Sequence, residues 1–117
     1  MLTKLFNRNM HTIKVFTKKV PLSKTSFDEF TIFSNELTIQ ANKAPGFIYS
    51  KSYWKYNACE SPLTLYTMSK WKTHADWKNW EKSKERQKVH VNNNIIIKNT
   101  EHTILYDKVP YNNIPLL

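Results

Sequence analysis

Two tryptophans and a histidine stand close together in the segment WKNWEKSKERQKVH, residues 77–90. Trp77 and Trp80 are three positions apart, and His90 follows ten positions after Trp80. A neutral imidazole can ligate a metal ion, and an indole ring can form the wall of an apolar cofactor pocket. The alternative is a helix packed by ordinary aromatic residues, with a solvated tail and His90 on the surface. Both interpretations fit the residue types.

The spacing of Trp80 and His90 restricts the first interpretation. Ten residues at about 100° each turn through about 1000°, which is about 80° short of three full turns. One straight helix would therefore point the two side chains in different directions. A shared site requires a break between them. We expect it near Ser83, where a charged run without apolar periodicity begins and where a loosened helix would let His90 turn inward.

The elements that would position these residues begin with a strand and a helix. Ile13 and Val15 alternate with polar residues, which predicts a half-buried strand over residues 11–20. Ser26 and Glu29 have the spacing of a capping box, and an apolar stripe follows at helical intervals. We expect this helix to continue to about Lys43, before a proline and a glycine.

Two aromatic-rich runs, residues 47–56 and 63–71, then predict a hairpin. Thr73 can cap a second helix, in which we expect Trp77 to be a core residue. A last strand is predicted over residues 102–109. The order strand, helix, strand, strand, helix, strand is that of an α+β, ferredoxin-like split βαβ fold.

This fold leaves one face of its sheet without helices. We expect four apolar side chains on that outer face, and pairing of two sheets would bury them in a homodimer, a dimeric α+β barrel. The four residues are Tyr49, Tyr53, Leu65 and Trp71.

Composition excludes several classes of function. The chain has 117 residues, the size of one domain, and a single glycine, so glycine-rich phosphate-binding loops are excluded. One cysteine cannot form an internal disulfide, and the four histidines lack zinc-ligand spacing. The net charge of +9 comes with no nucleic-acid recognition motif, so we expect no nucleic-acid partner. No run approaches the roughly 18 apolar residues of a membrane span, so we expect no stable membrane insertion.

These features predict a soluble protein in a reducing, cytoplasmic compartment. Residues 1–10 are basic and free of acids, and we interpret them as an N-terminal extension, with a targeting segment as the alternative. Residues 11–117 would form the single domain.

Two stretches, APGFIYSKSYWK and SKWKTHADWKNWEKS, resemble the antibiotic biosynthesis monooxygenase (ABM)-like dimeric α+β barrel family. Within it, the sequence is most similar to the Isd-type heme-degrading monooxygenases. The resemblance covers about residues 11–109. It implies that heme is both cofactor and substrate, that molecular oxygen opens the porphyrin ring, and that an unidentified reductant acts as external electron donor.

The resemblance also implies roles for individual residues. Trp80 would press on the porphyrin, and His90 would be the axial ligand and therefore the metal-binding residue. Val89 and Val91 would contact the macrocycle, and Arg86, or a neighbouring lysine, would pair with a propionate.

One position departs from the family pattern. Phe16 aligns with an asparagine that, in the heme-degrading members, hydrogen-bonds near the iron-bound oxygen. Phenylalanine cannot donate a hydrogen bond, so we expect heme binding to persist and oxygen activation to be impaired. The alternative function is a cofactor-independent ABM-type monooxygenase, or a non-catalytic ligand-binding dimer of the same fold.

Overall fold

The structure of the protein is a computed structural model that describes residues 11–22, 25–55, 64–93 and 97–110. The N-terminal extension expected at residues 1–10 and the turn around Cys59 lie outside this part of the chain. Seven elements follow one another in the order strand, helix, strand, strand, helix, helix, strand. They are β1 (His11–Pro21), α2 (Phe27–Asn42), β2 (Phe47–Lys55), β3 (Thr64–Trp71), α3 (His74–Glu81), α4 (Lys84–Asn93) and β4 (Ile97–Pro110).

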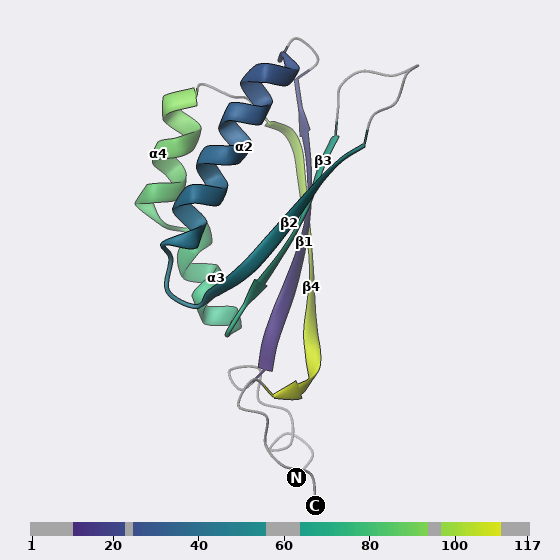
Figure 1. Ribbon diagram of the computed structural model, residues 1–117, viewed down its shortest axis with the longest axis vertical. Helices are drawn as coiled ribbons and strands as arrows, with labels where there is room; N and C mark the ends of the chain where they lie inside the picture. The colour runs from purple at the N-terminus through teal and green to yellow at the C-terminus, as the bar shows by residue number, and fades with distance from the viewer. Residues whose placement is uncertain (1–10, 23–24, 56–63, 94–96, 111–117) are drawn as a thin grey trace, which may run out of the picture.

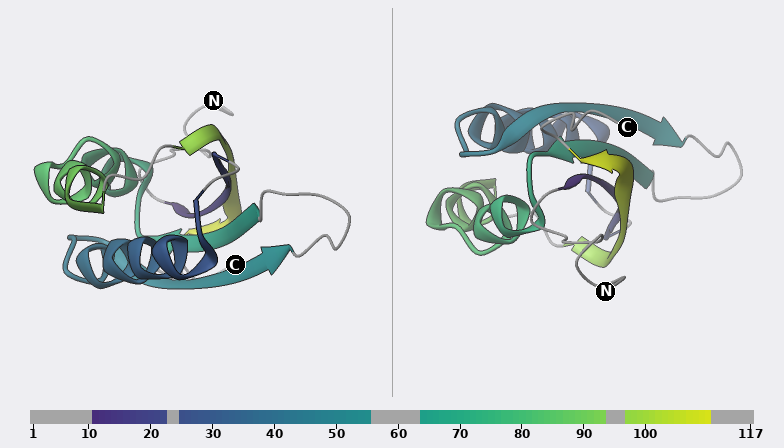
Figure 2. Two further views of the ribbon diagram at one scale, coloured as in Figure 1. Left: turned by 90° about the horizontal axis from the view of Figure 1, so that it is seen from above. Right: turned by 90° about the horizontal axis from the view of Figure 1, so that it is seen from below.

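The four strands form one antiparallel sheet in the order β2-β3-β1-β4. The helices all lie on one side of this twisted sheet (Figures 1 and 2). The predicted α+β, ferredoxin-like fold is therefore confirmed, and so is the hairpin of β2 and β3, in which Trp54 lies opposite Leu65. The last strand starts at Ile97, earlier than the sequence pattern indicated.

Local signals set the ends of α2 as predicted. The Ser26 hydroxyl accepts a hydrogen bond from the Glu29 N–H at 3.1 Å, and the Glu29 carboxylate accepts one from the Ser26 N–H at 3.3 Å. This capping box satisfies two N–H groups that the first turn leaves without helical partners. At the other end Lys43 is the C-cap, and Gly46 has a φ of 84°, which favours glycine.

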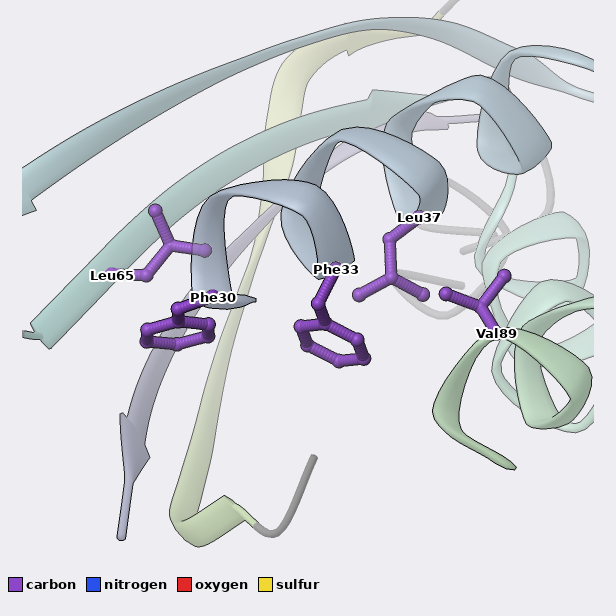
Figure 3. Packing of buried hydrophobic residues seen from close by; sticks show 5 residues of the cluster. All are labelled: Phe30, Phe33, Leu37, Leu65 and Val89. Carbon is purple, nitrogen blue, oxygen red and sulfur yellow. The ribbon is translucent and has the colours of Figure 1, made fainter. Parts of the chain in front are cut away.

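Two apolar clusters fill the space between the helices and the sheet. The first joins α2 to β3 and α4, and Figure 3 shows side chains of α2 directed toward that of Val89. The second joins β1 and β3 to α3 and contains Trp77, which confirms that residue as core. The first consists of Phe30, Phe33, Leu37, Leu65 and Val89, and the second of Ile13, Val15, Trp71 and Trp77.

The prediction of which side chains lie on the outer sheet face is right for two of the four residues and wrong for the other two. Leu65 and Trp71 are buried on the helix side, whereas Tyr49 and Tyr53 are exposed on the other side. Strand side chains alternate between faces, and the observed register assigns odd-numbered positions of β3 to the helix side. Aromatic content alone did not reveal this.

None of the helices in the described segments combines the length and apolar character needed to cross a membrane.

Candidate functional site

A small cavity lies between the helix side of the sheet and the helices. Its volume is about 70 Å³, and it is open on one side. Apolar and aromatic side chains make up one part of its wall: Leu37, Phe47, Leu65, Trp71, Trp77 and Trp80. Hydroxyl, charged and imidazole groups make up another: Thr17, Lys19, Thr67, Glu81, Arg86 and His102. The mixture of aromatic wall and convergent polar groups is typical of a ligand site.

The aromatic wall is held in place by contacts among its own members. The Trp80 ring stacks on that of Trp71, with centroids 6.4 Å apart and planes 25° apart. Trp71 also packs edge-on against Phe47 at 5.2 Å, and its indole N–H donates to the Ser69 hydroxyl at 3.0 Å. These contacts fix the Trp80 side chain at the cavity, where the sequence predicted a site residue.

The helix break predicted near Ser83 is confirmed. The Ser83 hydroxyl donates to the Trp80 carbonyl at 2.7 Å and accepts from the Arg86 N–H at 3.2 Å. It thus closes α3 and caps α4. The charged run after Ser83 was expected to be a loosened part of the helix. It forms a new helix, α4, instead. This helix brings Arg86, rather than His90, to the cavity.

His90 lies apart from the cavity and faces α2. Its ring packs edge-on against Phe33, with centroids 4.9 Å apart. Its Nε2 is buried and has no hydrogen-bond partner among the described residues. Burial, and after it the charges of Arg86 and Lys19, lowers the pKa of His90 from 6.5 to about 4. The imidazole is therefore neutral at pH 7, but the structure does not bring it together with Trp80.

Val89 and Val91 do not share a surface either. Val89 belongs to the core cluster beneath α2, whereas Val91 is 76% exposed. Two positions along a helix turn through about 200°, so the side chains point in nearly opposite directions. The predicted pair of apolar neighbours around His90 is therefore wrong for Val91.

The lowered pKa of His90 predicts a pH-dependent contribution to stability. The folded-state pKa lies below the unfolded value, so the unfolded chain binds the extra proton first, and stability falls as the pH drops from 6.5 to about 4. His90 is partly exposed, and solvent screening reduces the effect to about 1–2 kcal/mol. Urea unfolding at pH 7 and pH 4.5 should show a smaller loss for His90→Gln than for the unaltered protein. Equal losses would contradict this electrostatic role.

Phe16 lies on the face of the sheet opposite the cavity. It is 42% exposed and lines a shallow outer groove together with Tyr53 and Tyr66. The side chain of β1 that faces the cavity at this level is Thr17, one residue later. The expectation that Phe16 stands at the reactive centre is thus off by one residue, which in a strand reverses the face.

The polar end of the cavity contains a hydrogen-bonded pair that the sequence did not reveal. The Thr17 hydroxyl and His102 Nδ1 are 3.1 Å apart, and His102 Nε2 lies 3.6 Å from the Glu81 carboxylate. Burial lowers the pKa of His102, with Glu81 opposing the shift. Thr17 and His102 lie opposite one another in the pairing of β1 with β4, which no local pattern encodes.

Lys19 and Arg86 add positive charge to the same end. Burial, followed by the charge of Arg86, lowers the pKa of Lys19 from 10.5 to about 7. Burial also lowers the pKa of Arg86, which Glu81 partly opposes. Lys19 continues the series Ile13, Val15 and Thr17 on the helix side of β1, so strict alternation along that strand was the signal that could have found it.

No protein-family model and no curated protein sequence matches this chain. Solved structures match it in fold. A conserved protein from Methanosarcina mazei Go1 has a TM-score of 0.67 at 22% identity, over 86% of this chain and 97% of that one. SnoaB, a cofactor-independent oxygenase from Streptomyces nogalater, has a TM-score of 0.65 at 9% identity, over 84% and 94%. This chain has the fold of SnoaB.

The same fold also supports a different reaction. A hydroxynitrile lyase from Passiflora edulis matches with a TM-score of 0.67 at 12% identity, over 85% of this chain and 95% of the lyase. An oxygenase and a lyase therefore share the architecture, and the reaction must be inferred from the side chains of the cavity.

The cavity as described is too small for heme. The cavity volume of about 70 Å³ is less than half of the roughly 150 Å³ that an engineered cavity offers to benzene. His90 faces Phe33, and α4 is tied to α2 by a hydrogen bond of 2.8 Å from Asn93 to the Glu36 carboxylate. A macrocycle between Trp80 and His90 would require these two helices to separate.

Proposed function

We propose that the protein is an ABM-type monooxygenase that oxidises a small aromatic substrate in this cavity and does not require heme. The observation that carries the proposal is the pairing of an aromatic wall, Trp71 and Trp80, with a polar end formed by Thr17 and His102. The enclosed space of about 70 Å³ is smaller than one aromatic ring requires, so the ring would lie against this wall at the open side of the cavity. The fold shared with SnoaB supports the assignment to oxygenases.

In the proposed reaction the substrate supplies the electrons. A phenol loses its proton, and the electron-rich ring carbon forms a bond to oxygen. One oxygen atom remains in the product as a carbonyl, and the other leaves as water. For 1-naphthol the balance is C10H8O + O2 → C10H6O2 + H2O, so the substrate gives up four electrons and no other reductant is consumed.

In this proposal His102 accepts the phenolic proton. Its lowered pKa keeps the imidazole neutral at pH 7, and the Thr17 hydroxyl orients the ring. A general base of this kind contributes roughly 10²- to 10⁴-fold to a rate. We therefore expect His102→Gln to lower kcat for 1-naphthol by about 10²-fold or more in an oxygen-electrode assay.

Glu101→Gln provides the matched control for that variant. Glu101 is the neighbour of His102 on β4, is exposed, and points to the outer side of the sheet. Its replacement should leave kcat unchanged. Oxygen uptake that is equally fast in His102→Gln would contradict the assignment of the base.

We also propose that the protein is a homodimer whose sheets face each other. The outer face bears the exposed side chains of Phe16, Tyr53, Tyr66 and Leu105. Exposed apolar side chains gathered on a sheet face that no helix covers are typical of an interaction site. Two identical faces can cover each other through a twofold axis.

Heme degradation with an external electron donor is the second candidate function. One observation favours it: the neutral His90 has a buried Nε2 without a partner among the described residues, and this atom is suited to an axial bond. A hemin titration separates the two candidates. The heme-degrading candidate predicts a shifted Soret band that His90→Ala removes, whereas the first candidate predicts the same spectrum for both proteins.

A further inference from the structure

Two cations line the same end of the cavity. Lys19 comes from β1 and Arg86 from α4. Within the described segments, neither forms an ion pair with a carboxylate. Among the described residues, the guanidinium of Arg86 donates one long hydrogen bond, 3.4 Å, to the backbone carbonyl of Glu81.

The carboxylate of Glu81 does not neutralise this pair. Its own ion pair is with the Lys78 ammonium at 3.1 Å, and it offsets the charge of Arg86 only in part. Lys19 instead rests over the Phe33 ring, with its Nζ 5.6 Å from the centroid. A cation–π contact of this kind compensates only part of the cost of removing an ammonium from water.

Electrostatics therefore favours an anion at this end. Both side chains are partly buried. Charges that lose part of their hydration are normally paired, and the positive charge of Arg86 acts against that of Lys19. A carboxylate placed between them would relieve this repulsion. The planar guanidinium can donate two parallel hydrogen bonds to it, and the ammonium provides a third contact.

The rest of the cavity wall indicates the chemical nature of the remaining part of the ligand. Leu37, Trp71 and Trp80 provide an apolar wall beside the two cations. We propose that the cavity binds an aromatic carboxylate, with its carboxylate between Lys19 and Arg86 and its ring against Trp80. This substrate class rests on the function proposed above, although binding of the anion does not require turnover.

Benzoate and benzamide provide the test, because they share size and shape and differ in charge. Titrations followed through the indole N–H signals in ¹H–¹⁵N spectra, at pH 6.5, report binding next to the tryptophans. We expect benzoate to bind at least about tenfold more tightly than benzamide, as charge-assisted hydrogen bonds require. Lys19→Met and Arg86→Met should each lose most of this preference.

Lys18→Met is the matched control. Lys18 is the neighbour of Lys19 on β1, but it points to the outer face and pairs with Glu101 at 3.7 Å. This variant removes the same charge from the protein and should keep the preference for benzoate. Circular dichroism confirms that each variant is folded before the titration.

Equal affinities of the unaltered protein for the two compounds would overturn the proposal, as would a preference that survives in both Lys19→Met and Arg86→Met. Oxygen uptake with 1-naphthol by a protein that lacks the preference would refute the anion site and leave the oxygenase intact. A clear preference in a protein that oxidises no phenol would support the anion site and refute the oxygenase.

Discussion

A Phe16→Glu protein is expected to be a monomer at concentrations at which the unaltered chain is a dimer. Phe16 lies on β1, a central strand of the sheet, and is 42% exposed on the outer face beside Tyr53 and Tyr66. In the proposed dimer this position is covered by the partner. An unpaired carboxylate there would lose its hydration without a compensating partner, which costs several kcal/mol. We expect the dimer dissociation constant to rise by about 100-fold or more.

Sedimentation velocity over a range of concentrations measures this change. Val91→Glu is the control, because it makes the same change from apolar to acidic on the exposed side of α4, away from the sheet. That variant should remain a dimer. An unaltered chain that is monomeric at about 100 µM would refute the sheet-to-sheet dimer, as would a Phe16→Glu protein that stays dimeric.

Trp71→Ala is expected to cause the largest loss of stability of any single change considered. Trp71 is 1% exposed, and its ring contacts those of Phe47 and Trp80. Removing an indole from such a position forfeits its burial and leaves a cavity, which typically costs about 3–5 kcal/mol. Guanidinium unfolding of the variant should show this difference in the free energy of unfolding.

Two further variants show whether the loss of stability comes from the missing ring at position 71. Trp71→Phe keeps a ring against Phe47 and should cost less than half as much, whereas Trp54→Ala, at a partly buried position on β2, should also cost less. A loss below about 1 kcal/mol for Trp71→Ala would show that the second core cluster does not depend on this side chain.

The features that the sequence predicted correctly depend on neighbouring residues. Ser26 and Glu29 specify the start of α2 through contacts three positions apart. Ser83 separates α3 from α4 through hydrogen bonds of its own hydroxyl to residues three positions away on either side. Such signals do not require knowledge of the rest of the fold.

The features that the sequence missed depend on which face a side chain takes. Phe16 and Thr17 have opposite environments because side chains alternate along β1, and Thr17 continues the inward series of Ile13 and Val15. His102 reaches Thr17 only through the pairing of β1 with β4. Long-range register of this kind carries no signature within either segment.

The amino-acid composition also does not show which charged side chains lie at the cavity. The net charge of +9 indicated a general preference for anions, but Lys18 and Lys19 contribute equally to it. The structure separates them: Lys18 pairs with Glu101 on the outer face, and Lys19 is partly buried at the cavity. Alternation from Ile13 and Val15 assigns the two lysines to opposite faces, but only the three-dimensional arrangement shows which groups lie beside each of them.

Incorporation of ¹⁸O₂ during incubation with 1-naphthol is the most direct test of the proposed oxygenase. The protein is treated with a chelator, and neither hemin nor a reductant is added. The proposal predicts one labelled atom in the quinone carbonyl and one O2 consumed for each naphthol oxidised, with a rate that depends on His102. Product that forms only after hemin and a reductant are supplied, or a quinone without label, would contradict it.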